Sequence, residues 1–339
     1  MDNIFSSVIG HENEKRLLLK LYENGSIPPF LIFEGPMGVG KAQMAYAFAS
    51  LIMYDGKKEP IMSPDFYLVQ PMDDPEIDIS VGIRPLNFDI SKDIRIDKIR
   101  ELEKELSKKG TFEASMRVVL VLNGENLNTE SQNSFLKTLE EPPHETVIIM
   151  VISHRERILP TVYSRGKRFT FGPLKFEEFK EYPFEGQIPV LTLYSLSGGS
   201  IGRAKKIESS FVFSSRLQFI KNLARMDFLA VYDFMEEVAV DKAKTLDFLD
   251  MLSTLLRDVY VIRHGGEPLN EDIATEITDV AGTISEETIE EMLKRVRKAY
   301  TMVEANVQRR YVLLFIIAPL FPNNIRDKYD ATFDYLWEF

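Results

Sequence analysis

Short apolar runs alternate with amphipathic stretches through the first half of the chain. The apolar runs are rich in Val and Ile, which is typical of strands buried on both faces of a parallel sheet. They occupy residues 30–33, 118–122 and 146–152. Stretches with helical spacing lie between them, at residues 42–54, 96–109 and 131–141. This alternation predicts a doubly wound α/β domain.

The second half of the chain has a helical pattern. Residues 173–209 predict short helices, with a break at the Ser-Gly-Gly-Ser sequence of residues 197–200. Four apolar residues further on mark one face of a longer helix: Leu249, Leu252, Leu256 and Val259. A loop at residues 265–268 precedes another helical stretch at residues 284–308. From residue 211 onward we expect an all-α bundle of four to six helices.

Length and composition limit the class of protein. A chain of 339 residues exceeds what one core usually supports, so we expect two or three domains. The absence of cysteine excludes disulfides and thiolate metal sites, and the four histidines lie far apart. No apolar run approaches the ~20 residues that span a bilayer, and the first residues lack a signal-peptide pattern. We therefore expect a cytoplasmic protein with no metal and no membrane partner.

The charge distribution is uneven. A net charge of −11 argues against a free-standing nucleic-acid-binding protein. Six basic side chains nevertheless fall within fifteen positions: His154, Arg155, Arg157, Arg165, Lys167 and Arg168. A charge run of this kind is usually a solvated surface strip, and the motifs around it shift that balance.

Residues 31–43, LIFEGPMGVGKAQ, match the pattern of a phosphate-binding loop except at its last position. The pattern G-x-x-x-x-G-K-[ST] is met by Gly35, Gly40 and Lys41, and Gly38 adds a further flexible position. In such a loop the backbone N–H groups and the next helix N-terminus face the phosphates, and the lysine reaches the β- and γ-phosphates. The apolar run before the loop and the helical stretch after it fit this context.

The residues that would hold Mg²⁺ are missing. The Ser or Thr hydroxyl of the loop is a Mg²⁺ ligand, but Ala42 occupies that position. A second motif ends an apolar strand in Asp-Glu, whereas Leu122 and Asn123 stand there in this chain. Glu125 lies two residues beyond that register. We predict no intrinsic ATPase activity.

A longer stretch carries a family resemblance. Residues 133–166, NSFLKTLEEPPHETVIIMVISHRERILPTVYSRG, resemble the clamp-loader branch of the AAA+ ATPases, in which a LLKTLEEPP helix end precedes an SRC box. Further matches are VIGHENEKRLL at residues 8–18, SPDFYLV at 63–69 and IRIDKIRELEKEL at 94–106. The similarity covers residues 1–205 well, and ANVQRRYVLLF at residues 305–315 matches weakly.

The resemblance implies an architecture and partners. It implies an AAA+ RecA-like parallel-sheet domain at residues 1–172, a small helical lid domain at 173–209, and an all-α collar for oligomerisation at 210–339. Degenerate nucleotide motifs with a retained SRC arginine are typical of a non-hydrolysing subunit of the bacterial DNA polymerase III clamp loader. Its partners would be gamma/tau and delta subunits, with the sliding clamp and primed DNA as indirect partners in DNA replication. The chain would join a DNA-directed DNA polymerase holoenzyme without ATPase activity of its own.

The resemblance also implies roles for single residues. Arg165, the arginine of the SRC box, matches an arginine finger, which stabilises the charge on a phosphoryl group at a neighbouring subunit's site. The alternative is an ordinary surface arginine. Ser153 matches the first sensor position, where we expect a structural role. Gly202 replaces the second sensor arginine, with Arg203 one position late.

Three features depart from the family or from a catalytic pattern. The family usually carries a four-cysteine zinc module after the phosphate loop, and a chain without cysteine excludes that zinc site. Gly166 replaces the Cys of the SRC box, which we attribute to packing. Glu140 and Glu141 resemble an acid–base pair, but the Pro-Pro sequence after them ends the helix, so we expect a solvated helix end.

Alternatives remain open at this point. The chain is a non-hydrolysing arginine-finger subunit, an ATP-hydrolysing motor subunit of gamma/tau type, or an unrelated P-loop kinase. The kinase lacks its acidic Mg²⁺ partner and leaves the helical tail unexplained. The proposed role requires no cofactor, but the intact residues Gly35, Gly38, Gly40 and Lys41 leave ATP or ADP binding without turnover open.

Overall fold

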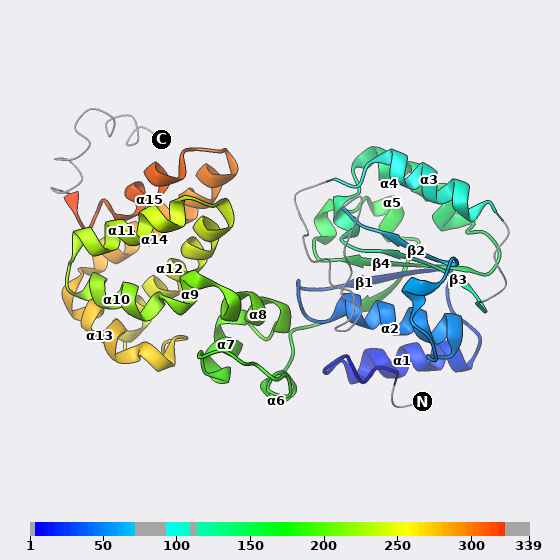
Figure 1. The fold of residues 1–339 in the computed structure, drawn as a ribbon, viewed down its shortest axis with the longest axis horizontal. Helices are drawn as coiled ribbons and strands as arrows, with labels where there is room; N and C mark the ends of the chain where they lie inside the picture. Colours follow the sequence, from blue (N-terminus) through cyan, green and yellow to red (C-terminus); the bar gives the residue numbers. More distant parts are fainter. Residues whose placement is uncertain (1–3, 72–92, 109–113, 323–339) are drawn as a thin grey trace. The chain divides into compact units, whose positions relative to one another are not determined.

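The computed structural model describes residues 4–71, 93–108 and 114–322. The chain forms two compact units (Figure 1). The first contains Met1–Tyr182 and Gly199–Gly202, and the second contains Pro183–Gly198 and Arg203–Phe339. Our division into three domains, with boundaries at residues 172 and 209, remains a prediction.

The first unit is built on a five-stranded parallel sheet. Its strands are β1 (Phe30–Glu34), β2 (Phe66–Val69), β3 (Arg117–Val121), β4 (Thr146–Ile152) and β5 (Lys167–Thr170). They lie in the order β2-β3-β4-β1-β5, and every pair is parallel. All of β4 is buried, as expected of a central strand covered on both faces. The three predicted apolar runs form the three central strands.

Helices cover both faces of this sheet (Figure 1). α1 (Glu12–Glu23) and α2 (Lys41–Tyr54) pack on one face, and α3 (Ile96–Leu106), α4 (Thr129–Glu140) and α5 (Pro160–Tyr163) pack on the other. Alternate residues of β3 serve the two cores, since Leu120 faces α2 and Val121 faces the α3–α4 side. The unit also contains η1 (Pro60–Met62), η3 (Gly124–Asn126), η4 (Arg155–Arg157) and α6 (Phe176–Phe179).

The second unit is helical in its described part. It contains α7 (Val190–Ser197), most of α8 (Ile201–Ser209), α9 (Phe211–Ser214), α10 (Arg216–Ala224), α11 (Phe228–Ala239), α12 (Lys242–Arg263), η5 (Glu271–Ile273), α13 (Ala274–Thr283), α14 (Glu286–Glu304) and α15 (Arg309–Ile317). The predicted apolar face of α12 is buried. The helical character of this region is therefore confirmed.

The fold class is confirmed, and two details of the prediction are wrong. The described residues from 211 onward form seven α-helices instead of four to six, because the chain turns at Ser215 and separates the short α9 from α10. The pattern also missed β2 and β5, which are the two edge strands of the sheet.

Candidate functional site

The phosphate loop lies at the carboxyl edge of the sheet, where residues 35–40 connect β1 to α2. Gly35, Gly38 and Gly40 have φ values of 143°, 76° and 105°, which residues with a side chain rarely adopt. Ligands of open parallel sheets bind at this edge, and the loop presents the start of α2 to it. The backbone thus has the course of a phosphate-binding loop.

Lys41 is turned into its own loop. Its Nζ donates to the carbonyl oxygens of Gly35 at 2.7 Å and Pro36 at 2.6 Å, and to Oγ of Ser153 at 3.1 Å. Burial lowers the pKa of Lys41 to about 8, although the nearby Glu125 carboxylate raises it somewhat. Lys41 is therefore mostly charged at neutral pH, and the oxygens of the loop stabilise that charge.

A buried carboxylate lies beside this lysine. Glu125 lies two residues beyond the strand-end register in the sequence, yet it is only 6% exposed. Its Oε1 accepts a hydrogen bond from the backbone N–H of Ser153 at 3.1 Å. It reaches this position because Asn123 has a left-handed φ of 49° and η3 then returns the chain toward β4. The structure brings together Lys41, Ser153 and Glu125, while Ala42 still offers no hydroxyl.

Several polar atoms at the same edge have no partner. In the described part of the chain, the buried side-chain atoms without a hydrogen bond are Nε2 and Oε1 of Gln70, Nδ2 of Asn123 and Oε2 of Glu125. Gln70 follows β2, and the other two follow β3. Buried polar groups are nearly always bonded to protein or water. These four atoms can therefore form hydrogen bonds with a water or a polar ligand.

Residues 199–202 lie against the phosphate loop. The N–H of Gly202 donates to the carbonyl of Gly38 at 2.8 Å, and Oγ of Ser200 donates to the carbonyl of Met37 at 2.9 Å. A Cβ at position 202 would lie 2.7 Å from the Cα of Gly38, closer than two such carbons can pack. An arginine at position 202, where the resemblance places the second sensor, does not fit this arrangement.

Arg165 lies at an edge of the first unit, where α4 and α5 meet. Its Nε donates to Oε1 of Glu140 at 2.8 Å, its Nη2 donates to the same oxygen, and its Nη1 donates to the carbonyl of Thr161. The helix end at Glu140 is exposed, as expected, and a residue 25 positions later pairs with it. Glu141 is exposed at the end of the same helix.

The helix before Arg165 is tied to β1. The hydroxyl of Tyr163 donates to Oε2 of Glu34 at 2.8 Å, and Thr170 donates to the other oxygen at 3.0 Å. The guanidinium of Arg155 lies 3.6 Å from the centre of the Tyr163 ring, and that of Arg168 lies 5.1 Å away, both favourable cation–π contacts. Two arginines of the basic cluster thus brace the tyrosine, and neither Glu34 nor Tyr163 stood out in the sequence.

Gly166 has a packing role, as expected. A Cβ at this position would lie 2.4 Å from Cγ1 of Ile32 and 3.1 Å from Cε1 of Phe30. The missing side chain lets the segment after Arg165 approach β1, with which β5 pairs directly.

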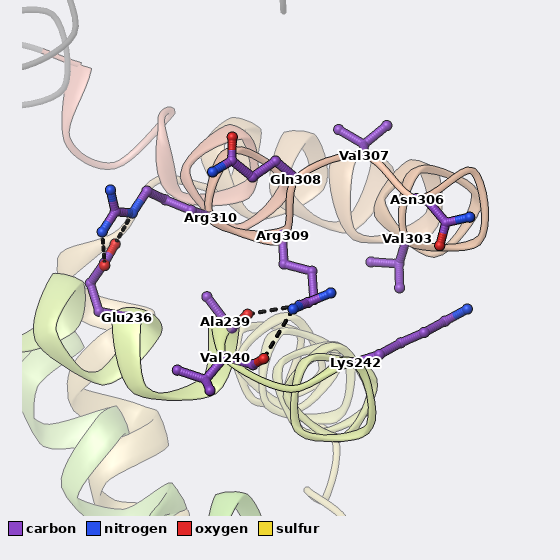
Figure 2. Close-up of a pocket in the computed structure, with 10 residues that line it drawn as sticks. All are labelled: Glu236, Ala239, Val240, Lys242, Val303, Asn306, Val307, Gln308, Arg309 and Arg310. Atoms are coloured by element: carbon purple, nitrogen blue, oxygen red, sulfur yellow. Dashed lines mark hydrogen bonds and ion pairs between the residues drawn. The ribbon is translucent and has the colours of Figure 1, made fainter.

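A separate hollow of about 420 Å³ lies in the helical unit, between the ends of α11 and α14 and the starts of α12 and α15 (Figure 2). Arg309 closes the end of α11 by donating to the carbonyls of Ala239 at 2.7 Å and Val240 at 2.9 Å. Arg310 forms a two-point ion pair with Glu236 of α11. The arginines of the weakly matching motif therefore join α15 to α11.

The described residues contain no group of three or more His, Asp or Glu side chains placed to hold a metal ion. None of the helices in the described ranges combines the length and hydropathy needed to cross a bilayer.

Comparison with known proteins identifies the family. The profile described as DNA polymerase III, delta subunit, matches residues 10–175. The profile described as DNA polymerase III, delta subunit, C terminal, matches residues 212–314. The chain belongs to the delta-subunit family of DNA polymerase III. The resemblance to clamp-loader subunits is thereby confirmed.

The relatives of this delta-family chain include delta′ subunits. It is 24% identical over 316 residues to DNA polymerase III subunit delta′ of Bacillus subtilis, covering 86% of this chain and 90% of the relative. The delta′ subunit of Pseudomonas aeruginosa is 24% identical over 211 residues, covering 57% and 59%. A solved gamma-subunit-related protein of Thermotoga maritima has a TM-score of 0.44 at 17% identity, covering 89% of this chain and 98% of that one.

Proposed function

We propose that the delta-family chain is a clamp-loader subunit of delta-prime type that hydrolyses no ATP and presents Arg165 to the ATP of a neighbouring subunit. It acts with gamma/tau and delta subunits to load the sliding clamp on primed DNA during DNA replication. This role places it in the cytoplasm, where bacterial chromosomal DNA is copied. Family membership removes the unrelated kinase.

The observation that carries the proposal is the position of Arg165. Its guanidinium is held at an exposed edge by Glu140 and the carbonyl of Thr161. An arginine finger needs this kind of placement, because it must reach an anion that belongs to another chain. Lys41, in contrast, is buried and bonded to its own loop.

The loop itself lacks the means to hold catalytic Mg²⁺. In P-loop NTPases a loop hydroxyl and a strand-end aspartate bind the metal, which neutralises charge between the β- and γ-phosphates. Ala42 and Leu122 stand at these positions and provide no oxygen ligand. Any ATP or ADP that enters the loop is a static ligand in this proposal.

We expect the purified chain to release no phosphate from ATP with Mg²⁺ above the buffer rate, and Lys41→Ala to change nothing. Phosphate release and equilibrium nucleotide binding, measured on the same sample, separate static binding from turnover. The motor alternative has one observation in its favour, the buried Glu125 carboxylate beside Lys41. Turnover that disappears in both Glu125→Gln and Lys41→Ala would establish that alternative.

The helical unit is the proposed collar. Its buried face of α12 and the ties between α11 and α15 make a rigid body with a core of its own. Exposed apolar side chains on α11 and just beyond it, Leu229 at 66% and Val240 at 75%, offer area for contact with other subunits. Ring closure through such a bundle leaves the sheet unit free to present Arg165.

A fragment that starts at Pro183 contains the whole helical unit and should bind gamma/tau and delta subunits, whereas residues 1–182 alone should not. Co-purification with tagged partners tests this, and circular dichroism verifies that each fragment is folded. Recovery of the partners by the sheet fragment but not by the helical one would contradict the collar assignment.

A further inference from the structure

We propose that Glu140 is a positioning residue that orients Arg165 for its contact with a neighbouring subunit's nucleotide. The inference rests on the proposed role of Arg165 as an arginine finger. It assigns a role in that contact to a glutamate that the sequence pattern had placed at a solvated helix end.

The bonds of Arg165 leave part of its guanidinium available. The group has five N–H donors. Three are used, two on Oε1 of Glu140 and one on the carbonyl of Thr161. With these partners among the described residues, one N–H on each terminal nitrogen remains, and the side chain is 32% exposed. These two N–H groups can donate to the oxygens of a phosphate, for which a guanidinium is well suited.

The end of its own helix is an unfavourable place for the carboxylate of Glu140. It is the last residue of α4, where the partial negative charge of the helix end disfavours a carboxylate and favours a cation. Arg165 supplies the offsetting charge from another element. A local conflict of this kind, resolved by a single long-range partner, is expected at functional positions.

The two helices that carry the ion pair, α4 and α5, are held in place by packing and by a hydrogen bond. Phe135 and Leu139 of α4 are buried against the sheet, and Tyr163 ties α5 to Glu34 of β1. The backbone near Arg165 is thus set by packing, and what stays free is the rotation of a long side chain. An arginine without a partner samples many rotamers, so the carboxylate of Glu140 selects the one that faces outward.

The experiment uses the reconstituted complex and compares Glu140→Ala, Glu140→Asp and the neighbouring control Glu141→Ala, each with and without Arg165→Ala. We expect Glu140→Ala to lower the rate of clamp loading about two- to fivefold, the range for an exposed ion pair, and to lower total ATPase by no more than Arg165→Ala does. Glu140→Asp should restore part of the rate, and Glu141→Ala should have the normal rate. In the Arg165→Ala background, Glu140→Ala should have no further effect.

Three outcomes would overturn the inference. They are a normal rate in Glu140→Ala, an equal loss in Glu141→Ala, and an added loss from Glu140→Ala when Arg165 is already absent. Thermal melting of each variant distinguishes a folding defect, which would persist without Arg165. If Arg165→Ala itself has the normal rate, the arginine-finger proposal fails, which is a different result from these three.

Discussion

Complexes that carry Arg165→Ala should assemble normally but show reduced DNA- and clamp-stimulated ATPase and slow clamp loading. An arginine finger stabilises charge on the transferring phosphoryl oxygens and is worth ~10³–10⁵ in rate in GTPases. A ring with several ATP sites loses that help at one site only. The fall in total ATPase is then limited to the share of that site, while clamp loading, which needs the full cycle, falls further.

Matched variants make this expectation specific. Arg165→Lys keeps the charge but lacks the planar fork, so it should recover only part of the rate. Lys167→Ala removes an exposed charge two residues away and should do less. Arg155→Ala should also do less, because its guanidinium stacks on Tyr163. Steady-state ATPase and a fluorescence assay of clamp loading measure these effects.

A specific pair of results would contradict the finger. If Arg165→Ala complexes load clamps at the normal rate while Lys41→Ala complexes fail, the chain uses its own phosphate loop. Analytical size exclusion of both complexes verifies that assembly is unchanged, so that a loss of rate is not a loss of subunits.

The central strands could be predicted because burial on both faces leaves a continuous apolar run, as in residues 146–152 of β4. The edge strands could not. In β5 only Phe169 is buried, and Lys167, Arg168 and Thr170 are exposed, so no run appears in the sequence. Short edge strands with charged side chains are common because they discourage pairing with other chains.

The candidate site could be predicted in part. The spacing of Gly35, Gly40 and Lys41 is a local motif, and it predicted the strand–loop–helix course that the chain has from β1 to α2. The place of Glu125 depends on the left-handed turn at Asn123, which register counting along a straight strand cannot anticipate. The pairing of Glu140 with Arg165 joins residues 25 positions apart and follows only from the packing of α4 and α5.

The loop glycines also have a role that needs no nucleotide. β5 ends beside β1, and the N–H of Phe171 donates to the carbonyl of Glu34 at 2.8 Å, immediately before Gly35. A Cβ at position 35 would lie 2.0 Å from the carbonyl oxygen of Phe171. Backbone atoms cannot move aside as a side chain can, so this crossing of two segments requires glycine. A chain that had lost catalysis would still retain Gly35 for this reason.

Gly35→Ala should therefore destabilise the sheet unit much more than Gly40→Ala. Both positions have positive φ, so both substitutions introduce backbone strain of about 1–3 kcal/mol. At position 40 the nearest atom to a Cβ is Oε1 of Gln43 at 3.7 Å, an ordinary contact. Gly35→Ala adds the overlap with the Phe171 oxygen, for which we expect a further loss of about 1–3 kcal/mol.

Urea unfolding measures this difference in the free energy of unfolding, and hydrogen exchange of the β1 and β4 amides assigns it to the sheet unit. Equal losses for Gly35→Ala and Gly40→Ala would mean that the loop relaxes away from Phe171 at little cost. The glycine would then be retained for a ligand and not for packing. A larger loss at position 35, in protein free of nucleotide, would show that the fold itself requires the first glycine of the phosphate loop.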